Sequence, residues 1–148
     1  MLAMLGSVPE KARSDARFKR ALILAGHLAV CRENWLDRMA GDGRRQAAWW
    51  PRASDLDRLR ARFARVETRW SEYLTGLGDE DLDVDFEFPV TGGGYRWNIE
   101  GQIFQLVGHA YYHRGQIALL VDELGGKAED TDYLYWAVKR SPERWKRI

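Results

Sequence analysis

The sequence predicts an all-α protein, a four-helix bundle with a short β-hairpin before its last long helix. Three observations lead to this prediction. Apolar residues recur at helical spacing through three long segments, glycines separate these segments, and one stretch of alternating acidic and apolar residues interrupts them. The 148 residues form one expected domain, 1–148, because the chain has a single domain's length and no Pro/Gly-rich linker divides it.

The first long helix is expected over residues 14–39. Ser14 is a good N-cap residue, and Gly41 follows the last periodic position as a C-terminal glycine does. The apolar positions recur at spacings of three, four and seven: Leu24, Leu28, Trp35 and Met39.

The second and third long helices have start signals of their own. Ser54 begins the second, with Asp57 three residues later as a weak capping box. The third is expected from Asn98 to Leu124, and Gly125 ends it. Both segments keep the helical period, through Leu56, Leu59, Phe63, Val66, Trp70 and Leu74 in one and Ile103, Val107, Ala110, Ile117, Leu120 and Val121 in the other.

Residues 79–97 differ in character. DLDVDFEF alternates acidic and apolar residues, as a strand does, and TGGG then predicts a turn before the return strand Tyr95-Arg96-Trp97. The acidic run has two interpretations. It could bind calcium, or it could be the charged outer face of an exposed edge strand, which we favour.

A bundle of three long helices needs a fourth element to close it. The candidates are the brief N-terminal MLAML and the tail at 130–140, DTDYLYWAVKR. Only eight residues precede Pro9, so either the first helix is truncated or a partner chain or the tail supplies the missing packing. An incomplete bundle would expose apolar surface, which favours association with a second copy.

Composition narrows the function classes. No apolar run approaches the ~18 residues of a membrane span, the N-terminus lacks the basic start of a signal peptide, and Cys31 has no partner for a disulfide. We therefore expect a cytoplasmic protein that binds no membrane. The arginines of the second helix alternate with acidic residues, so we interpret them as a solvated face and expect no nucleic-acid partner.

Two of the three histidines stand four positions apart on the third long helix. His109 and His113 therefore lie on one helix face, one turn apart, where two imidazoles can chelate an ion. The spacing alone is a weak signal, and Ala110 occupies the place of the glutamate in an HExxH metalloprotease, which excludes that class.

The third histidine lies on the first long helix. Taken alone, His27 reads as a core residue bonded to a carbonyl, but all three histidines fall on or near inward faces of two helices. Three such imidazoles suit Zn, Ni, Fe or Cu. Cys31 follows His27 by four and could be a softer fourth ligand, but we favour a small buried hydrophobic residue near the site. Gln116 follows His113 by three and could orient it.

Three pieces of the sequence together resemble the DinB/YfiT family of metal-binding helical bundles. They are GHLAVCRENWLDRM around His27, GHAYYHRGQIALLVDELGG around His109 and His113, and TDYLYW after them. The stretch FPVTGGGYRWNIEGQIFQLVGH is similar to the family's lead-in to that last helix. The resemblance covers roughly residues 14–137.

The resemblance implies a four-helix bundle with up-down-down-up connectivity, often a homodimer. It also implies a metal site of His27, His109 and His113 that commonly holds nickel or zinc. Relatives include thiol S-transferases and thiol-dependent isomerases that use bacillithiol, mycothiol or glutathione, and many members have no established activity. The short first segment departs from the family, whose first helix is full length.

Two functions remain open at this point. The first is a metal-dependent enzyme of thiol S-transferase or hydrolase type, acting on a small molecule with a divalent ion and a low-molecular-weight thiol; no residue can be assigned as its general base. The second is a non-catalytic, stress-associated binding protein whose ion is structural.

Overall fold

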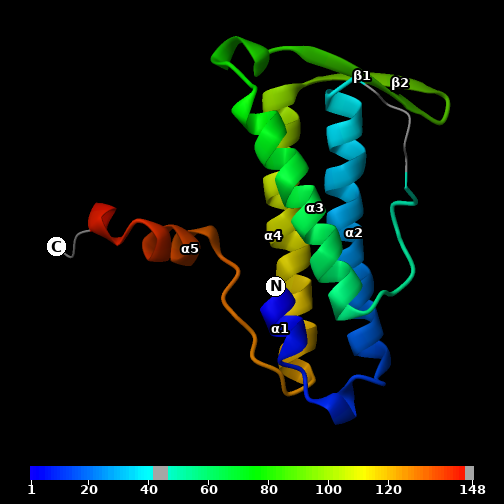
Figure 1. The fold of residues 1–148 in the computed structure, drawn as a ribbon, viewed down its shortest axis with the longest axis vertical. Helices are drawn as coiled ribbons and strands as arrows, with labels where there is room; N and C mark the ends of the chain where they lie inside the picture. The colour runs from blue at the N-terminus through cyan, green and yellow to red at the C-terminus, as the bar shows by residue number, and fades with distance from the viewer. Residues whose placement is uncertain (42–46, 146–148) are drawn as a thin grey trace.

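The computed structural model describes residues 1–41 and 47–145. It is mostly helical, with one antiparallel pair of strands (Figure 1). The helices are α1 (Leu2–Gly6), α2 (Ala16–Met39), α3 (Leu56–Thr75), α4 (Ile99–Glu123) and α5 (Tyr133–Arg140); the strands are β1 (Asp85–Val90) and β2 (Gly93–Asn98). Single 3-10 turns lie at 10–12, 79–81 and 142–144. None of the described helices is both long and apolar enough to span a bilayer.

The three long helices lie side by side (Figure 1). α2 and α3 run in the same direction, so a long connection returns the chain between them, and α4 runs in the opposite direction. The short α1 packs near the end of α4 at which the chain leaves the bundle, in contact with α2, α3 and α4. Side chains of α2 and α4 therefore face each other along most of the molecule.

Local capping fixes the helix starts within one residue of the sequence prediction. α2 begins after Asp15, whose carboxylate accepts a hydrogen bond from the Arg17 amide at 2.8 Å, and not after Ser14. α3 begins after Asp55 in place of Ser54. In both cases an aspartate directly follows a serine and is the cap used. Asn98 caps α4 as expected.

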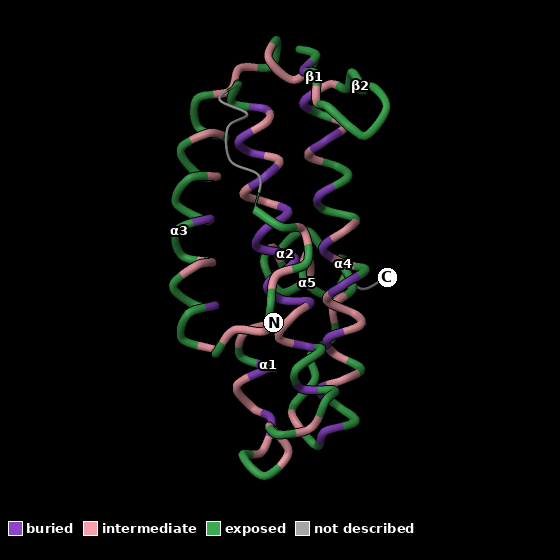
Figure 2. The backbone as a smooth tube through the Cα atoms, turned by 90° about the vertical axis from the view of Figure 1, so that its right-hand side faces the viewer, coloured by how far each residue is buried: buried purple, intermediate pink, exposed green. Residues whose placement is uncertain are grey.

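The main core lies where α1, α2 and α4 meet. Its fully buried side chains include Leu5, Leu28 and Ile117. Figure 2 shows buried residues along α2 and α4, whereas α3 has only two, Leu59 and Val66. α2 is therefore the central helix of the bundle, which explains why so many of its side chains, polar ones included, are buried.

Charged side chains fix α3 against α2. The guanidinium of Arg62 donates twice to the carboxylate of Glu33, once from Nε at 2.9 Å, and Arg69 forms an ion pair with Asp37. The sequence predicted a solvated arginine face for this helix. That holds for Arg58 and Arg60, which pair with aspartates on their own turn, but Arg62 and Arg69 connect two helices.

The hairpin covers the end of the bundle opposite α1 (Figure 1). Its register pairs Asp85 with Asn98 and Val90 with Gly93, and Gly92 turns with a φ of 87°, which glycine adopts readily. Phe86 packs on Met39 and Ile99 in a second, smaller core. The acidic residue Glu87 pairs across the strands with Arg96, as an exposed charged strand would.

α1 supplies the fourth packing element, and the tail does not. Met4 and Leu5 are buried against the long helices. The Tyr133 ring lies 6.3 Å from that of Tyr111 on α4, and from there α5 extends away from the bundle (Figure 1). The remaining large side chains of α5 are about half exposed: Leu134, Tyr135 and Trp136.

Candidate metal centre

The three histidines of the chain meet at the interface of α2 and α4. His27 comes from the middle of α2, and His109 and His113 come from successive turns of α4. Their ring centroids lie 5.0 Å (His27–His109), 4.9 Å (His27–His113) and 4.5 Å (His109–His113) apart. His27 and His113 are buried and His109 is partly buried, so the cluster sits at the edge of the core.

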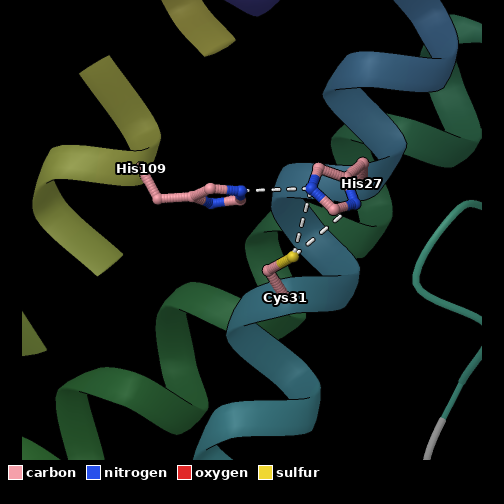
Figure 3. A group of neighbouring side chains, drawn as sticks. All are labelled: His27, Cys31 and His109. Atoms are coloured by element: carbon pink, nitrogen blue, oxygen red, sulfur yellow. Dashed lines mark hydrogen bonds between the residues drawn. The ribbon is translucent and has the colours of Figure 1, made fainter. Parts of the chain in front are cut away.

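The ring nitrogens of His27 and His109 face each other (Figure 3). Their Nε2 atoms are 3.1 Å apart. Without an ion, one of the two must carry a hydrogen that it donates to the other. With an ion of ~2.0–2.1 Å metal–nitrogen distance, two ligands at 90–109° stand roughly 2.9–3.4 Å apart. The observed separation therefore fits two ligands of one ion without rearrangement.

Hydrogen bonds on the other nitrogens decide which tautomers His27 and His113 adopt. His27 Nδ1 lies against the carbonyl oxygen of Trp49, and His113 Nδ1 is 2.7 Å from Oε1 of Gln116. Both oxygens only accept, so each Nδ1 carries the hydrogen. The lone pair of each ring is then on Nε2, which is the form that binds a metal.

His109 lacks such a partner. Its Nδ1 is buried and has no hydrogen-bond partner among the described residues. With Nε2 donating to His27, Nδ1 holds an unused lone pair; with Nε2 on an ion, Nδ1 holds a hydrogen. In either state no hydrogen bond at Nδ1 fixes the orientation of the His109 ring, whereas His27 and His113 each have one.

Their surroundings keep the rings of His27 and His109 neutral. Burial lowers the pKa of His27, and the charge of His113 lowers it further, against the raising effect of the Trp49 carbonyl. Burial, followed by the charges of His113, His27 and Arg32, lowers the pKa of His109 to about 4. At neutral pH these imidazoles are therefore unprotonated, as a metal ligand must be.

Cys31 lies one turn from His27 on the same face of α2. Its Sγ is 3.5 Å from Nε2 and 3.6 Å from Nδ1 of His27, so it lies nearly equidistant from the two ring nitrogens (Figure 3). Burial raises the pKa of the thiol to about 11, so it is protonated at neutral pH. Within the described residues, His27, Cys31 and His109 form a group whose ligand atoms lie within 4.8 Å of one another and could hold a metal ion. His113, the third ligand expected from the sequence, is not part of this group.

These donors fit a divalent ion by their chemistry. Zn and Ni accept imidazole nitrogens as ligands, and the Nε2 atoms of His27 and His109 stand at a spacing that suits two ligands of one ion. The model of the DinB superfamily matches residues 22–117, about two thirds of the chain. The chain belongs to the DinB superfamily. Neither the curated proteins nor the solved structures gave a match.

The DinB match contains His27, Cys31, His109, His113 and Gln116. It ends before α5 and begins after α1, so α1, which packs against the long helices of this DinB chain, lies outside it. The family relationship therefore covers the candidate site, and the packing around the matched part is a property of this chain.

Sequence reasoning missed two residues at this DinB site, Trp49 and Trp50. The Trp50 indole stacks on His27 with a centroid distance of 3.9 Å and an angle of 4°, and its ring centroid lies 6.0 Å from that of His113 in an edge-to-face arrangement. Trp50 remains 58% exposed, so it covers the histidines from the solvent side. The signal was the dipeptide Trp49-Trp50 before Pro51, an unusual pair in a connection that carries no periodicity.

Proposed function

We propose that this DinB chain is a metal-binding protein whose His27, His109 and His113 hold one divalent ion. The observation that carries the proposal is the 3.1 Å approach of the His27 and His109 Nε2 atoms. The lone pair on His113 Nε2, fixed by Gln116, supports the third position. Burial and mutual charge keep His27 and His109 neutral, so neither needs to lose a proton to bind at neutral pH.

Cys31 is assigned a place beside the ion rather than on it. Its raised pKa makes deprotonation, and therefore binding as a thiolate, costly. In this role the thiol is a small, polarisable contact for the ring, and Gln116 holds His113 by its Nδ1 hydrogen. Imidazole ligands favour nickel or zinc among the common divalent ions.

The reaction proposed is that of a thiol S-transferase or a hydrolase, with a small-molecule substrate. A divalent ion held by imidazoles lowers the pKa of a thiol or water that binds it and so supplies a nucleophile at neutral pH. The chain's own contribution is positioning. Trp49 and Gln116 hold His27 and His113 by their Nδ1 atoms, and the Trp50 indole limits the access of water to His27.

The second candidate is a non-catalytic, stress-associated protein with a structural ion. The observation that favours it is the absence, among the described residues, of a carboxylate within the histidine cluster that could act as a general base. The two functions differ in a simple experiment. If chelation lowers the melting temperature strongly and no thiol and electrophile are turned over, the ion is structural. Turnover that added zinc or nickel restores identifies the enzyme.

Titration calorimetry with Zn²⁺ and Ni²⁺ tests the binding itself. Metal-free wild type is expected to bind one ion, and His109→Ala and His113→Ala are expected to lose at least ~10-fold in affinity. Leu119→Ala, an exposed position on the same helix, is the control and should bind as wild type does. Equal binding by all four proteins would place the ion elsewhere and refute the assignment.

The assembly proposed is an up-down-down-up four-helix bundle that forms a homodimer in the cytoplasm. The parallel α2 and α3 and the antiparallel α4 support the connectivity, with the short α1 as the first helix. The dimer is supported by exposed apolar side chains of α5, among them Leu134 and Trp136, which a single copy leaves in solvent. Native mass spectrometry distinguishes a dimer from a monomer.

A further inference from the structure

We propose that Asn34 and Arg38 are positioning residues that hold the segment 47–51 against His27 and thereby set the metal affinity of the site. The inference rests on the proposed function, because the affinity it concerns is that of the histidine cluster. Along α2, Cys31 follows His27 by four residues, Asn34 follows Cys31 by three, and Arg38 follows Asn34 by four. All four therefore share one face of the helix. This face meets the segment along its whole length.

The first contact is between Asn34 and Ala47. Asn34 is 1% exposed, and its side chain makes both hydrogen bonds of a backbone pair: Nδ2 donates to the Ala47 carbonyl at 2.8 Å, and Oδ1 accepts from the Ala47 amide at 3.0 Å. A buried amide that satisfies both groups of one residue fixes the position and the orientation of that residue. Asn34 therefore determines where the segment begins its path across α2.

The second contact is between Arg38 and three aromatic rings. Its guanidinium carbon lies 4.6 Å from the Trp35 ring, 5.1 Å from Trp49 and 5.0 Å from Phe88. Arg38 Nε is buried and has no hydrogen-bond partner in the part of the chain that the structure describes. The guanidinium therefore makes cation–π contacts with three rings, and Trp49 is one of them.

A third contact lies next to His27 itself. A Cβ at Gly26 would be only 3.0 Å from Pro51 Cγ, so the glycine allows the end of the segment to approach α2 closely. Between the Asn34 and Gly26 contacts, the segment presents the Trp49 carbonyl to His27 Nδ1 and stacks Trp50 on the His27 ring. The position of these two groups depends on the anchors at either side.

The consequence for the site is chemical. A neutral imidazole has two tautomers, and only a fixed acceptor at Nδ1 keeps the lone pair on Nε2. Trp49 offers a backbone carbonyl, so no substitution at Trp49 removes the acceptor; what can vary is where the segment holds it. Loss of such an outer partner typically weakens metal binding about 10- to 100-fold. Asn34 and Arg38 lie two to three helical turns from His27, and they act on it through the position of the Trp49 carbonyl.

The test uses Ni²⁺ titration of the full chain and ¹⁵N NMR of the imidazoles without metal. Asn34→Leu and Arg38→Met are expected to weaken Ni²⁺ binding about 10- to 100-fold. The His27 nitrogen shifts should move from the Nδ1–H tautomer to a mixture. Arg65→Met, an exposed arginine of α3, is the matched control and should leave both readouts unchanged. Arg38→Lys, which keeps the cation, should retain most of the affinity.

Folded Asn34→Leu and Arg38→Met proteins with wild-type affinity and a wild-type His27 tautomer would overturn the proposal, and so would an equal loss in Arg65→Met. If an α2 variant does not fold by circular dichroism, Trp49→Leu removes the Arg38 contact from the segment's side and is held to the same outcomes. If wild type binds no Ni²⁺, the proposed function fails, while the tautomer measurement on the metal-free protein still decides whether the segment is held as inferred.

Discussion

The Nε2 atoms of His27 and His109 lie 3.1 Å apart, although 82 positions separate the two residues in the chain. The contact exists because α2 and α4 pack along each other and both place a histidine at the same level of their interface. A pair of lone pairs at this distance is unfavourable unless a hydrogen or an ion lies between them. The packing of α2 against α4 at this level therefore depends on whether a hydrogen or an ion lies between the two nitrogens.

Acid should destabilise the metal-free protein through His109 and His27. The folded pKa of His109 is lowered to about 4 from the 6.5 of an unperturbed histidine, and that of His27 is also lowered. Between these pH values the unfolded chain binds more protons than the folded one. Stability is therefore fully present above pH 6.5 and declines as the pH falls toward 4. Urea midpoints across this window measure the decline.

His109→Gln supplies the control for that measurement, because the amide does not titrate. Its midpoint should fall less steeply over the same pH range than that of wild type, which separates His109 from the carboxylates that begin to titrate at the acid end. Parallel slopes for the two proteins would contradict the assignment of a lowered pKa to His109.

Cys31 should be unreactive in the folded protein and dispensable for the ion. Its pKa is raised to about 11 by burial, so alkylation by iodoacetamide at neutral pH should be slow in the native state and fast in urea. Cys31→Ala should keep its metal, at a cost of about 1 kcal/mol in the free energy of unfolding. Loss of the ion in this variant would instead show that the sulfur is a ligand.

The ion pair between α2 and α3 should contribute measurably to stability. Arg62 and Glu33 are joined by two hydrogen bonds, and their side chains are only 26% and 21% exposed. Glu33→Gln is expected to lower the free energy of unfolding by about 1–3 kcal/mol. Asp57→Asn breaks the Arg60 pair, whose aspartate is 91% exposed, and should change it by less than ~0.5 kcal/mol. Equal losses in the free energy of unfolding for the two variants would show that burial does not decide how much each ion pair contributes.

The short α1 should behave as core and α5 as surface. Leu5 is fully buried, so Leu5→Ala is expected to cost about 2–5 kcal/mol in chemical denaturation. Leu134→Ala removes the same atoms from a side chain that is 47% exposed, and the cost should be below ~0.5 kcal/mol in the monomer. The opposite order would mean that the tail, and not α1, completes the bundle in solution.

The long helices could be predicted because their signals are local. Asn98 before an apolar-periodic run and Gly125 after it gave the bounds of α4 to within a residue. Serine and aspartate are adjacent at both 14–15 and 54–55, and either residue can cap a helix. The sequence pattern therefore does not show which of the two is the cap. The alternation in 81–88 and the glycines after it also predicted the hairpin, but with the wrong bounds. The chain forms a 3-10 turn at 79–81, β1 begins only at Asp85, and Pro89, Gly93 and Gly94, which were expected in the turn, lie in the strands.

The remaining features depend on tertiary contacts. MLAML and DTDYLYWAVKR are both apolar enough to close a bundle, and only packing decides that Leu5 is buried while Trp136 is half exposed. Periodicity placed His27 and His113 on inward faces, where they are buried. It could not reveal that Trp49 and Trp50 cover His27, because a connection without periodicity carries no signal for a contact 22 positions away.

Elemental analysis of untagged wild-type protein, with its native mass, shows directly whether the histidine cluster holds an ion. We expect one nickel or zinc ion per chain in wild type and less than a tenth of that in His27→Ala, His109→Ala and His113→Ala, with full occupancy in Leu119→Ala. Folded wild-type protein that contains no divalent metal and takes up none on addition of Zn²⁺ or Ni²⁺ would contradict it.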